Sequence, residues 1–167
     1  MKRNSANFTI ILSAIAIALG AMASGCKSNR ETSKPVNITC PPGSKLVGDL
    51  PPDGDEQACW KTVNGEQVKD GPMVIYRPGG FKMMEGNYAD GKQDGEWKMY
   101  YESGAKKSID HYLDGVQTGD HVSWYEDGQI DAKGQYKNGQ QDGVWKRWAP
   151  DGVKNWEETY KDGKKIS

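Results

Sequence analysis

Aromatic and polar residues alternate along most of the chain beyond residue 62, between short segments that contain glycine. The segments GEWKMYY, DHVSWYE and GVWKRWA are rich in aromatic residues and show no helical stripe. Successive side chains of a β-strand point to opposite faces, so this pattern is typical of strands. We therefore expect strands of about 7–9 residues joined by tight turns.

The alternating region repeats every 24 residues. Units begin at residues 86, 110 and 134, residues 62–85 form a diverged first unit, and a fragment of a fifth unit follows. One tyrosine column and three glycine columns keep this step: Tyr88, Tyr112, Tyr136 and Tyr160; Gly91, Gly115, Gly139 and Gly163; Gly71, Gly95, Gly119 and Gly143; Gly80, Gly104, Gly128 and Gly152. Such periodicity predicts an array whose units contact only their neighbours.

Each unit contains two turn signals. The first consists of the dipeptides Asp90-Gly91, Asp114-Gly115, Asn138-Gly139 and Asp162-Gly163, which favour the positive φ angles of hairpin turns. The second lies near Ser103-Gly104, Asp127-Gly128 and Asp151-Gly152. Each unit is therefore predicted to be a hairpin. The predicted fold is all-β: an elongated antiparallel β-meander of stacked hairpin repeats over residues 62–167, behind a small N-terminal cap.

Large rings are predicted on both faces of this sheet. One face should carry Tyr76, Tyr100, Trp124 and Trp148, and the opposite face Met73, Trp97, His121 and Trp145. Rings that pack on one another across strands would stabilise a single elongated sheet. If a partner binds the sheet, we expect the column of Tyr76, Tyr100, Trp124 and Trp148 to contact it, because one ring per unit makes a regular platform.

The N-terminus has the pattern of an export signal. Lys2 and Arg3 precede the apolar residues 8–23, a stretch shorter than the roughly 20 residues of a membrane-spanning helix. The sequence Ala23-Ser24-Gly25-Cys26 resembles a bacterial lipoprotein signal, although Ala23 stands where that family usually has Leu. The resemblance implies removal of residues 1–25 and lipidation of Cys26. Lys27, in place of Asp, implies an outer-membrane destination. Residues 26–39 are polar and are expected to form a flexible tether.

Residues 40–61 are expected to form a Pro-rich cap held by a disulfide. With Cys26 lipidated, Cys40 and Cys59 are the remaining cysteines, and exported proteins usually oxidise such a pair. A two-cysteine zinc site is a poor alternative, since no His is nearby. The acidic stretch of residues 53–56 lacks the ligand spacing of an EF-hand loop and is read as a solvated turn.

The repeat motif resembles the bacterial variant of the MORN repeat. The motif is carried by residues 95–100, GEWKMY, and by Tyr112, Gly115 and Gly119, and it recurs over residues 62–167 with ring-for-ring changes such as His121. The resemblance implies an elongated all-β sheet that acts in protein–protein or membrane-surface association. The YwqK-like branch of that family is commonly labelled as antitoxin, but neutralising an intracellular toxin does not fit an exported protein.

Composition argues against two functional classes. The chain has 22 Lys and Arg against 23 Asp and Glu, for a net charge of −1, whereas a sequence-independent nucleic-acid binder needs a strongly basic surface. Its only histidines are His111 and His121, and adjacent carboxylates such as Glu157 and Glu158 should point to opposite faces of a strand. We therefore expect no enzyme activity, no catalytic residues, no metal site and no cofactor.

These observations predict a lipid-anchored protein of the cell envelope. Its repeat sheet would serve as a scaffold for an envelope protein partner that the sequence does not identify. The alternative is binding of a cell-wall glycan or a choline-type ligand through the aromatic ladders, since stacked Trp and Tyr can hold both. The period of 24 residues favours the MORN-like interpretation over choline-binding repeats, which are nearer 20 residues.

Overall fold

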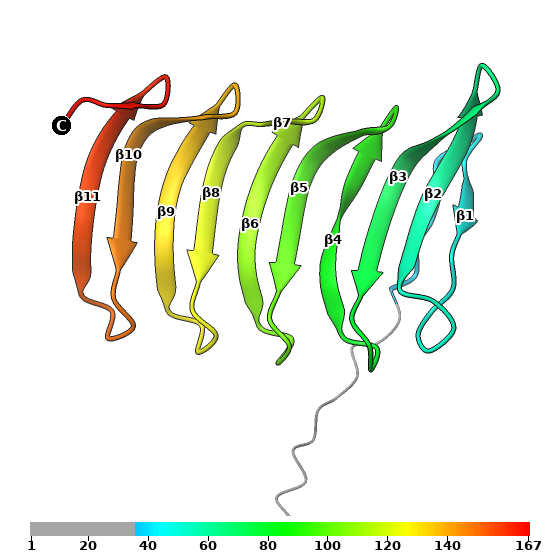
Figure 1. Ribbon diagram of the computed structural model, residues 1–167, viewed down its shortest axis with the longest axis horizontal. Coiled ribbons are helices and arrows are strands. Elements are labelled where there is room, and N and C mark those ends of the chain that lie inside the picture. The colour runs from blue at the N-terminus through cyan, green and yellow to red at the C-terminus, as the bar shows by residue number, and fades with distance from the viewer. Residues whose placement is uncertain (1–35) are drawn as a thin grey trace, which may run out of the picture.

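Strands lie side by side in chain order throughout the part of the protein that the computed structural model describes, residues 36–167 (Figure 1). The predicted signal peptide, the predicted lipidation site at Cys26 and most of the predicted tether fall outside these residues. The strands are β1 Lys45–Val47, β2 Glu56–Val63, β3 Glu66–Tyr76, β4 Lys82–Ala89, β5 Lys92–Tyr100, β6 Lys106–Leu113, β7 Val116–Gln117, β8 Gly119–Trp124, β9 Ile130–Lys137, β10 Gln140–Trp148, β11 Lys154–Lys161 and β12 Lys164–Lys165.

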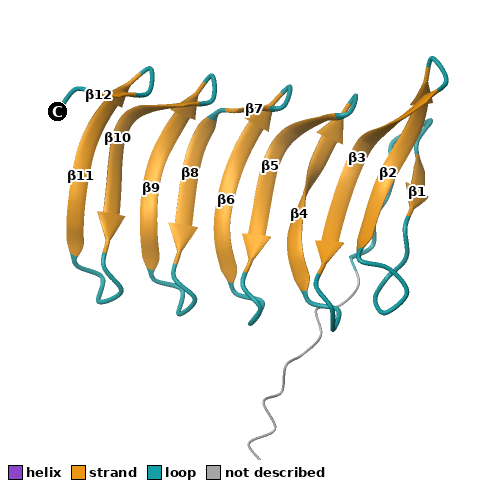
Figure 2. Cartoon of the chain, viewed as in Figure 1, coloured by secondary structure: helices purple, strands orange, loops and turns teal. Residues whose placement is uncertain are grey.

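The predicted all-β meander is confirmed. All strand pairs are antiparallel and follow the chain, except that the short β7 pairs with β6 beside β8. No helix occurs in residues 36–167, and loops lie at the two ends of the strands (Figure 2). The described sheet is thus a single open layer.

The hairpin turns have the geometry that their dipeptides predict. The Asn and Asp residues have φ angles of 47–52°, and the glycines after them have φ angles of 75–89°. Two consecutive residues at positive φ match the right-handed twist of the flanking strands, which explains why Asp-Gly and Asn-Gly recur there. The positions are Asn64-Gly65, Asp90-Gly91, Asp114-Gly115, Asn138-Gly139 and Asp162-Gly163.

Backbone hydrogen bonds tie each hairpin turn to the unit before it. In each case the turn glycine donates its N–H to a carbonyl 22 residues earlier, at 2.8–2.9 Å. The pairs are Gly91 to Lys69, Gly115 to Gln93, Gly139 to Gln117 and Gly163 to Gln141. These bonds set the stacking of the units independently of their side chains.

Tyrosine hydroxyls join neighbouring units at the opposite ends of the strands. Tyr101 donates its hydroxyl to the carbonyl of Trp124, and Tyr125 donates to the carbonyl of Trp148, each at 2.8 Å. The corresponding residue of the next unit is Ala149, which has no hydroxyl. This side-chain link therefore ends with the fourth unit.

Replacing Tyr125 by Phe should lower the free energy of unfolding by about 1 kcal/mol, because the Trp148 carbonyl loses a hydrogen-bond donor. Chemical denaturation would measure the change. The matched control is Tyr136→Phe, since the Tyr136 ring packs on Trp145 but its hydroxyl has no hydrogen-bond partner within the described residues. Equal losses from both variants would show that the hydroxyl link does not stabilise the array.

The two predicted faces of the sheet are observed. On face A, the side of Met73, Trp97, His121 and Trp145, buried Ala58, Met73 and Trp97 form a core cluster. The Trp97 ring packs edge-on against Tyr88 at 5.2 Å and Tyr112 at 6.1 Å between ring centroids. Face B is the side of Tyr76, Tyr100, Trp124 and Trp148. Cross-strand ring packing therefore takes the place of a second layer on face A.

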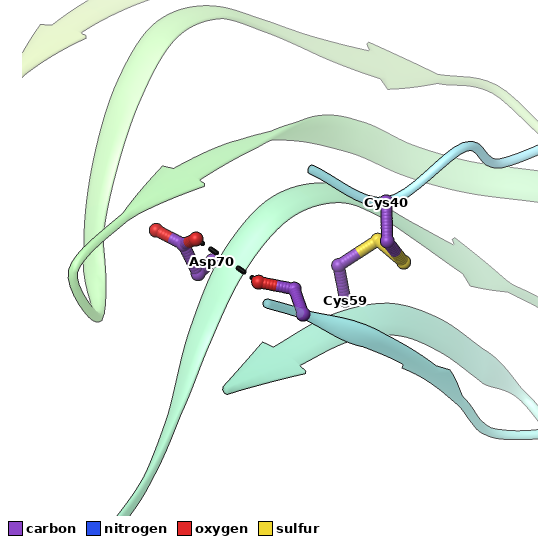
Figure 3. The surroundings of a disulfide bond; sticks show 4 residues. Cys40, Cys59 and Asp70 are labelled. Atoms are coloured by element: carbon purple, nitrogen blue, oxygen red, sulfur yellow. Dashed lines mark hydrogen bonds between the residues drawn. A yellow bond between two sulfur atoms is a disulfide. The ribbon is translucent and has the colours of Figure 1, made fainter. Parts of the chain in front are cut away.

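The cap continues the sheet. β1 pairs with β2, and the predicted boundary between residues 61 and 62 lies within β2. The predicted Cys40–Cys59 disulfide is present, beside β3 and Asp70 (Figure 3). Asp70 accepts a hydrogen bond from the Ser44 hydroxyl at 3.0 Å. The cap is thus fastened to the first hairpin by a covalent bond and by polar contacts.

Candidate interaction surfaces

Rings and lysines alternate across face B where the strands end. Strand register places Lys82 opposite Tyr76, Lys106 opposite Tyr100, Ile130 opposite Trp124 and Lys154 opposite Trp148. The Lys82 ammonium lies 5.1 Å from the Tyr100 ring centroid, and that of Lys106 lies 5.6 Å from the Trp124 centroid. Cations at this distance are attracted to the ring face, so these lysines cover part of the ring surface.

Glu85 holds this arrangement at Tyr100. Its carboxylate accepts the Tyr100 hydroxyl and the Lys82 ammonium, the latter at 2.8 Å. Burial opposes ionisation of Glu85, but the bonds from Lys82 and Tyr100 outweigh it, so the pKa of Glu85 is lowered. Burial and the Glu85 carboxylate raise the pKa of Tyr100. Glu85 is therefore charged and Tyr100 neutral at physiological pH, which keeps the ring in place.

The predicted partner-binding column differs in exposure along its length. Tyr76 is buried, with 3% of its surface exposed, and its N–H donates to the Asp55 carbonyl of the cap at 2.6 Å. Tyr100, Trp124 and Trp148 are half-buried. Tyr76 is thus part of the contact with the cap, and the exposed part of the column comprises the other three rings.

Apolar side chains join two of these rings into a central patch on face B. The register brings Ile109 opposite Val122, which lies two residues before Trp124 on β8, and Ile130 opposite Trp124. We define the central patch as Ile109, Val122, Trp124, Ile130 and Trp148. Lysines surround it on the paired strands: Lys98, Lys106, Lys133, Lys146 and Lys154. An apolar centre with a charged rim is the usual anatomy of a protein interface.

Face A has an open hollow of about 750 Å³ over the C-terminal strands β8 to β11. Two small side chains of this lining, Ser123 and Ala132, lie opposite each other on β8 and β9; Met99 and Arg147 stand at the positions equivalent to Ser123, and Ser108 and Trp156 at those equivalent to Ala132. Its ring-bearing residues are His121, Tyr125, Trp145, Trp156 and, from the end of β10, Trp148, which also lines a smaller hollow with Lys133, Val144 and Lys146. The volume of the larger hollow lies within the range of small-molecule sites, about 300–1,000 Å³.

Two β-bulges aim polar side chains at this hollow. In the pairing of β9 with β8, Ile130 and Ala132 have partners but Asp131, between them, has none. In the pairing of β11 with β10, Asn155 likewise has no partner between Lys154 and Trp156. Bulges re-aim side chains and are frequent next to functional sites. Both Asp131 and Asn155 line the hollow on face A.

The charged groups in the hollow compensate each other. The Arg147 guanidinium lies 3.4 Å from one Asp131 carboxylate oxygen, and the Ser123 hydroxyl donates to the other at 3.1 Å. The amides of Asn155 and Gln141 also line the hollow and make no side-chain hydrogen bond within the described residues. The hollow therefore combines rings with hydrogen-bonding groups that remain available.

The middle unit differs from its neighbours at a coupled pair of positions. An added Cβ at Gly86 would lie 2.3 Å from the Trp97 ring, and one at Gly134 would lie 2.2 Å from the Trp145 ring. In the middle unit, Asp110 stands at the position of these glycines and His121 at the position of these tryptophans. There the smaller imidazole leaves room for a side chain, and His121 Nδ1–H donates to Asp110 Oδ1 at 2.6 Å.

Asp110 is held ionised by its neighbours. Burial opposes the charge, but His121, Ser108 and Gln117 donate hydrogen bonds to the carboxylate, so the pKa of Asp110 is lowered. His121 keeps its predicted place in the ring column, stacked on Trp145 at 5.4 Å between centroids and edge-on to Tyr136 at 6.0 Å. The sequence interpretation of His121 as a packing ring omitted this carboxylate partner.

Residues 36–167 contain neither a metal-ligand cluster nor a candidate membrane-spanning helix. Among residues 36–167, no group of three or more His, Cys, Asp and Glu side chains is arranged to hold a metal ion. That part of the chain also contains no helix of the length and apolarity needed to cross a membrane. Both faces present rings and hydrogen-bonding groups suited to binding.

Comparison with known proteins supports the repeat assignment for the middle of the array. A search of curated proteins found no match. MORN repeats are often protein- or membrane-interaction modules. Residues 93–114 and 117–138, which start one 24-residue period apart, match the family model described as MORN repeat variant, so this part of the chain is similar to that family.

Proposed function

We propose that this protein is a non-enzymatic lipoprotein, anchored in the cell envelope through Cys26, whose sheet binds an envelope protein through the central patch of face B. The observation that carries the proposal is the half-buried state of Trp124 and Trp148 on a sheet face that no described element covers. Rings of this kind dominate interface energies when a partner covers them.

The lysine rim indicates the chemistry of the partner. Five lysines surround the central patch, and three of them have acidic partners nearby: Lys98 with Glu96, and Lys146 and Lys154 with Glu157. Lys106 and Lys133 have no ion pair within residues 36–167. A partner that presents apolar residues surrounded by acidic ones would complement this face, and charge complementarity would speed association.

Lysines that lie over the rings of face B disfavour a choline-type ligand on the predicted column of Tyr76, Tyr100, Trp124 and Trp148. A quaternary ammonium group binds where several ring faces are free to surround it. On face B the ammonium groups of Lys82 and Lys106 already lie over Tyr100 and Trp124. A cationic ligand would have to displace them against charge repulsion, which supports a protein partner instead.

Site-specific crosslinking in intact cells tests this function. The full-length protein would carry a photo-crosslinking amino acid at Lys133, on the rim of the central patch, or at Glu126, in an exposed turn, as the matched control. We expect a discrete adduct from position 133 only, and we expect Trp124→Ala to reduce it about tenfold, as for an interface hot spot. Adducts that persist in a folded Trp124→Ala protein would contradict binding through this patch.

The anchor is tested in the same cells. Cys26→Ser should move the protein from the membrane fraction to the soluble fraction and remove the lipid mass from the N-terminal peptide, since acyl chains supply the membrane affinity. Mass spectrometry of an unmodified Cys26 in the membrane-bound protein would contradict lipidation.

A further inference from the structure

We propose that the hollow on face A is a carbohydrate-binding site that takes a neutral oligosaccharide, with a pyranose ring stacked on Trp156 and hydroxyls bound by Asn155, Asp131 and Gln141. This site lies on the opposite face from Trp124, and Trp148, at the end of β10, is the one member of the central patch that also borders it. It therefore adds a second ligand of a different class to the proposed protein interaction.

Trp156 departs from the structural ring columns of the array. Its equivalents in the preceding units are Met84, Ser108 and Ala132, so the fold does not require a ring at this position. It is half-buried at the rim of the hollow, on β11, and packs on Tyr160 at 6.3 Å between centroids. A flat ring beside a hollow offers the stacking surface that the C–H face of a pyranose uses.

The polar groups match sugar hydroxyls. Asn155 and Gln141 carry amides that both donate and accept, and neither makes a side-chain hydrogen bond in residues 36–167. Asp131 has acceptor capacity beyond its contacts with Ser123 and Arg147, because a carboxylate accepts about four hydrogen bonds. Planar groups of this type bind pairs of adjacent hydroxyls, each of which also donates and accepts.

Charge in the hollow favours a neutral ligand. A quaternary ammonium group would meet both the Asp131 carboxylate and the Arg147 guanidinium, so it would gain little net attraction here. Arg147 is also paired with Asp131 at 3.4 Å, so its charge is compensated and a phosphate or carboxylate would gain little. Because the charges of Arg147 and Asp131 balance, the hollow suits a ligand that carries hydroxyl groups and no charge.

The position of the hollow disfavours an extended peptide. Peptides commonly bind sheets by adding a strand to an edge, where backbone groups are unpaired. This hollow lies on the face of β8 to β11, where the backbone groups of β9 and β10 are paired on both sides within the sheet. A ligand seated over β9 and β10 therefore meets side chains, which suits stacking and hydroxyl recognition, whereas the outer edge of β11 pairs with β12 only at Tyr160 and Lys161.

Titration of the full-length lipidated protein in detergent micelles tests the site. The probes are chitotetraose, cellotetraose and a disaccharide muropeptide, followed by indole N–H signals in NMR spectra and by calorimetry. We expect saturable binding of at least one oligosaccharide, with a shift of the Trp156 indole signal. Binding of the bare sugars would show that the neutral glycan alone suffices. Binding of the muropeptide but neither bare oligosaccharide would show that recognition depends on the charged peptide and would overturn the proposal.

Matched variants locate the binding. Trp156→Ala should weaken binding about tenfold, which is the upper end of what one ring contact contributes. Asn155→Ala should weaken it by a smaller factor. Trp124→Ala, on face B, should leave it unchanged, so failure of the protein-partner proposal is separable from failure of this one. No binding of any probe at millimolar concentration, or equal affinity in folded Trp156→Ala protein, would overturn the proposal.

Discussion

Gly134→Ala is expected to lower the free energy of unfolding by about 3 kcal/mol, at the upper end of the cost of overpacking. The new methyl group would lie 2.2 Å from Cδ2 and 2.3 Å from Cε2 of the Trp145 ring. Trp145 is almost fully buried and packs against both Tyr136 and His121, so it has little room to move. Denaturant unfolding would measure the loss.

The middle unit provides the matched rescue. Gly134→Asp alone would push a carboxylate into the Trp145 ring, whereas Gly134→Asp combined with Trp145→His copies the Asp110–His121 pair. We expect the double variant to be more stable than Gly134→Asp by about 2 kcal/mol, within the range of coupling between residues in contact. A double variant no more stable than Gly134→Asp would show that ring overlap does not explain the glycine.

Removing the disulfide by Cys40→Ala and Cys59→Ala is expected to destabilise the cap by about 3 kcal/mol, the chain-entropy value for a loop of this size. Cys59 is fully buried. Pro41, next to Cys40, packs closely on β3, because a Cβ added at Gly71 would lie 2.5 Å from the Pro41 Cδ atom. Freeing this segment should therefore also loosen β1 and the start of β3.

The loss should be local. In a repeat array each unit contacts its neighbours only, so the C-terminal hairpins retain their own contacts. Hydrogen exchange should show faster exchange of amides in β1 to β3 and unchanged protection in β10 and β11, which serve as the internal control. Uniform loss of protection along the sheet, or no change after reduction of the wild-type protein, would contradict this expectation.

The sequence was sufficient to predict the meander because its signals are local. Asp-Gly and Asn-Gly define turns at positive φ, and alternation assigns each ring to a face of its strand. The disulfide also followed from counting cysteines. Residues 93–138 then matched a repeat family with the same period.

The candidate sites were only partly predictable. The ring column was identified, but the burial of Tyr76 depends on the cap, which contacts it from another part of the chain. Asp110 was overlooked, although comparing it with Gly86 and Gly134 in the neighbouring units would have revealed it. Trp156 also stands out in such a comparison, since its equivalents are Met84, Ser108 and Ala132.

Turn dipeptides and side-chain alternation act within a few residues, so the chain alone defined the hairpins, the period and the face of each ring. The exposure of each ring and the shape of the hollow depend on contacts between strands, so they could be seen only in the folded sheet. The register shifts that turn Asp131 and Asn155 toward face A depend on pairing with β8 and β10. The hollow beside Trp156 exists because Ser123 and Ala132, from different strands, are both small where they meet.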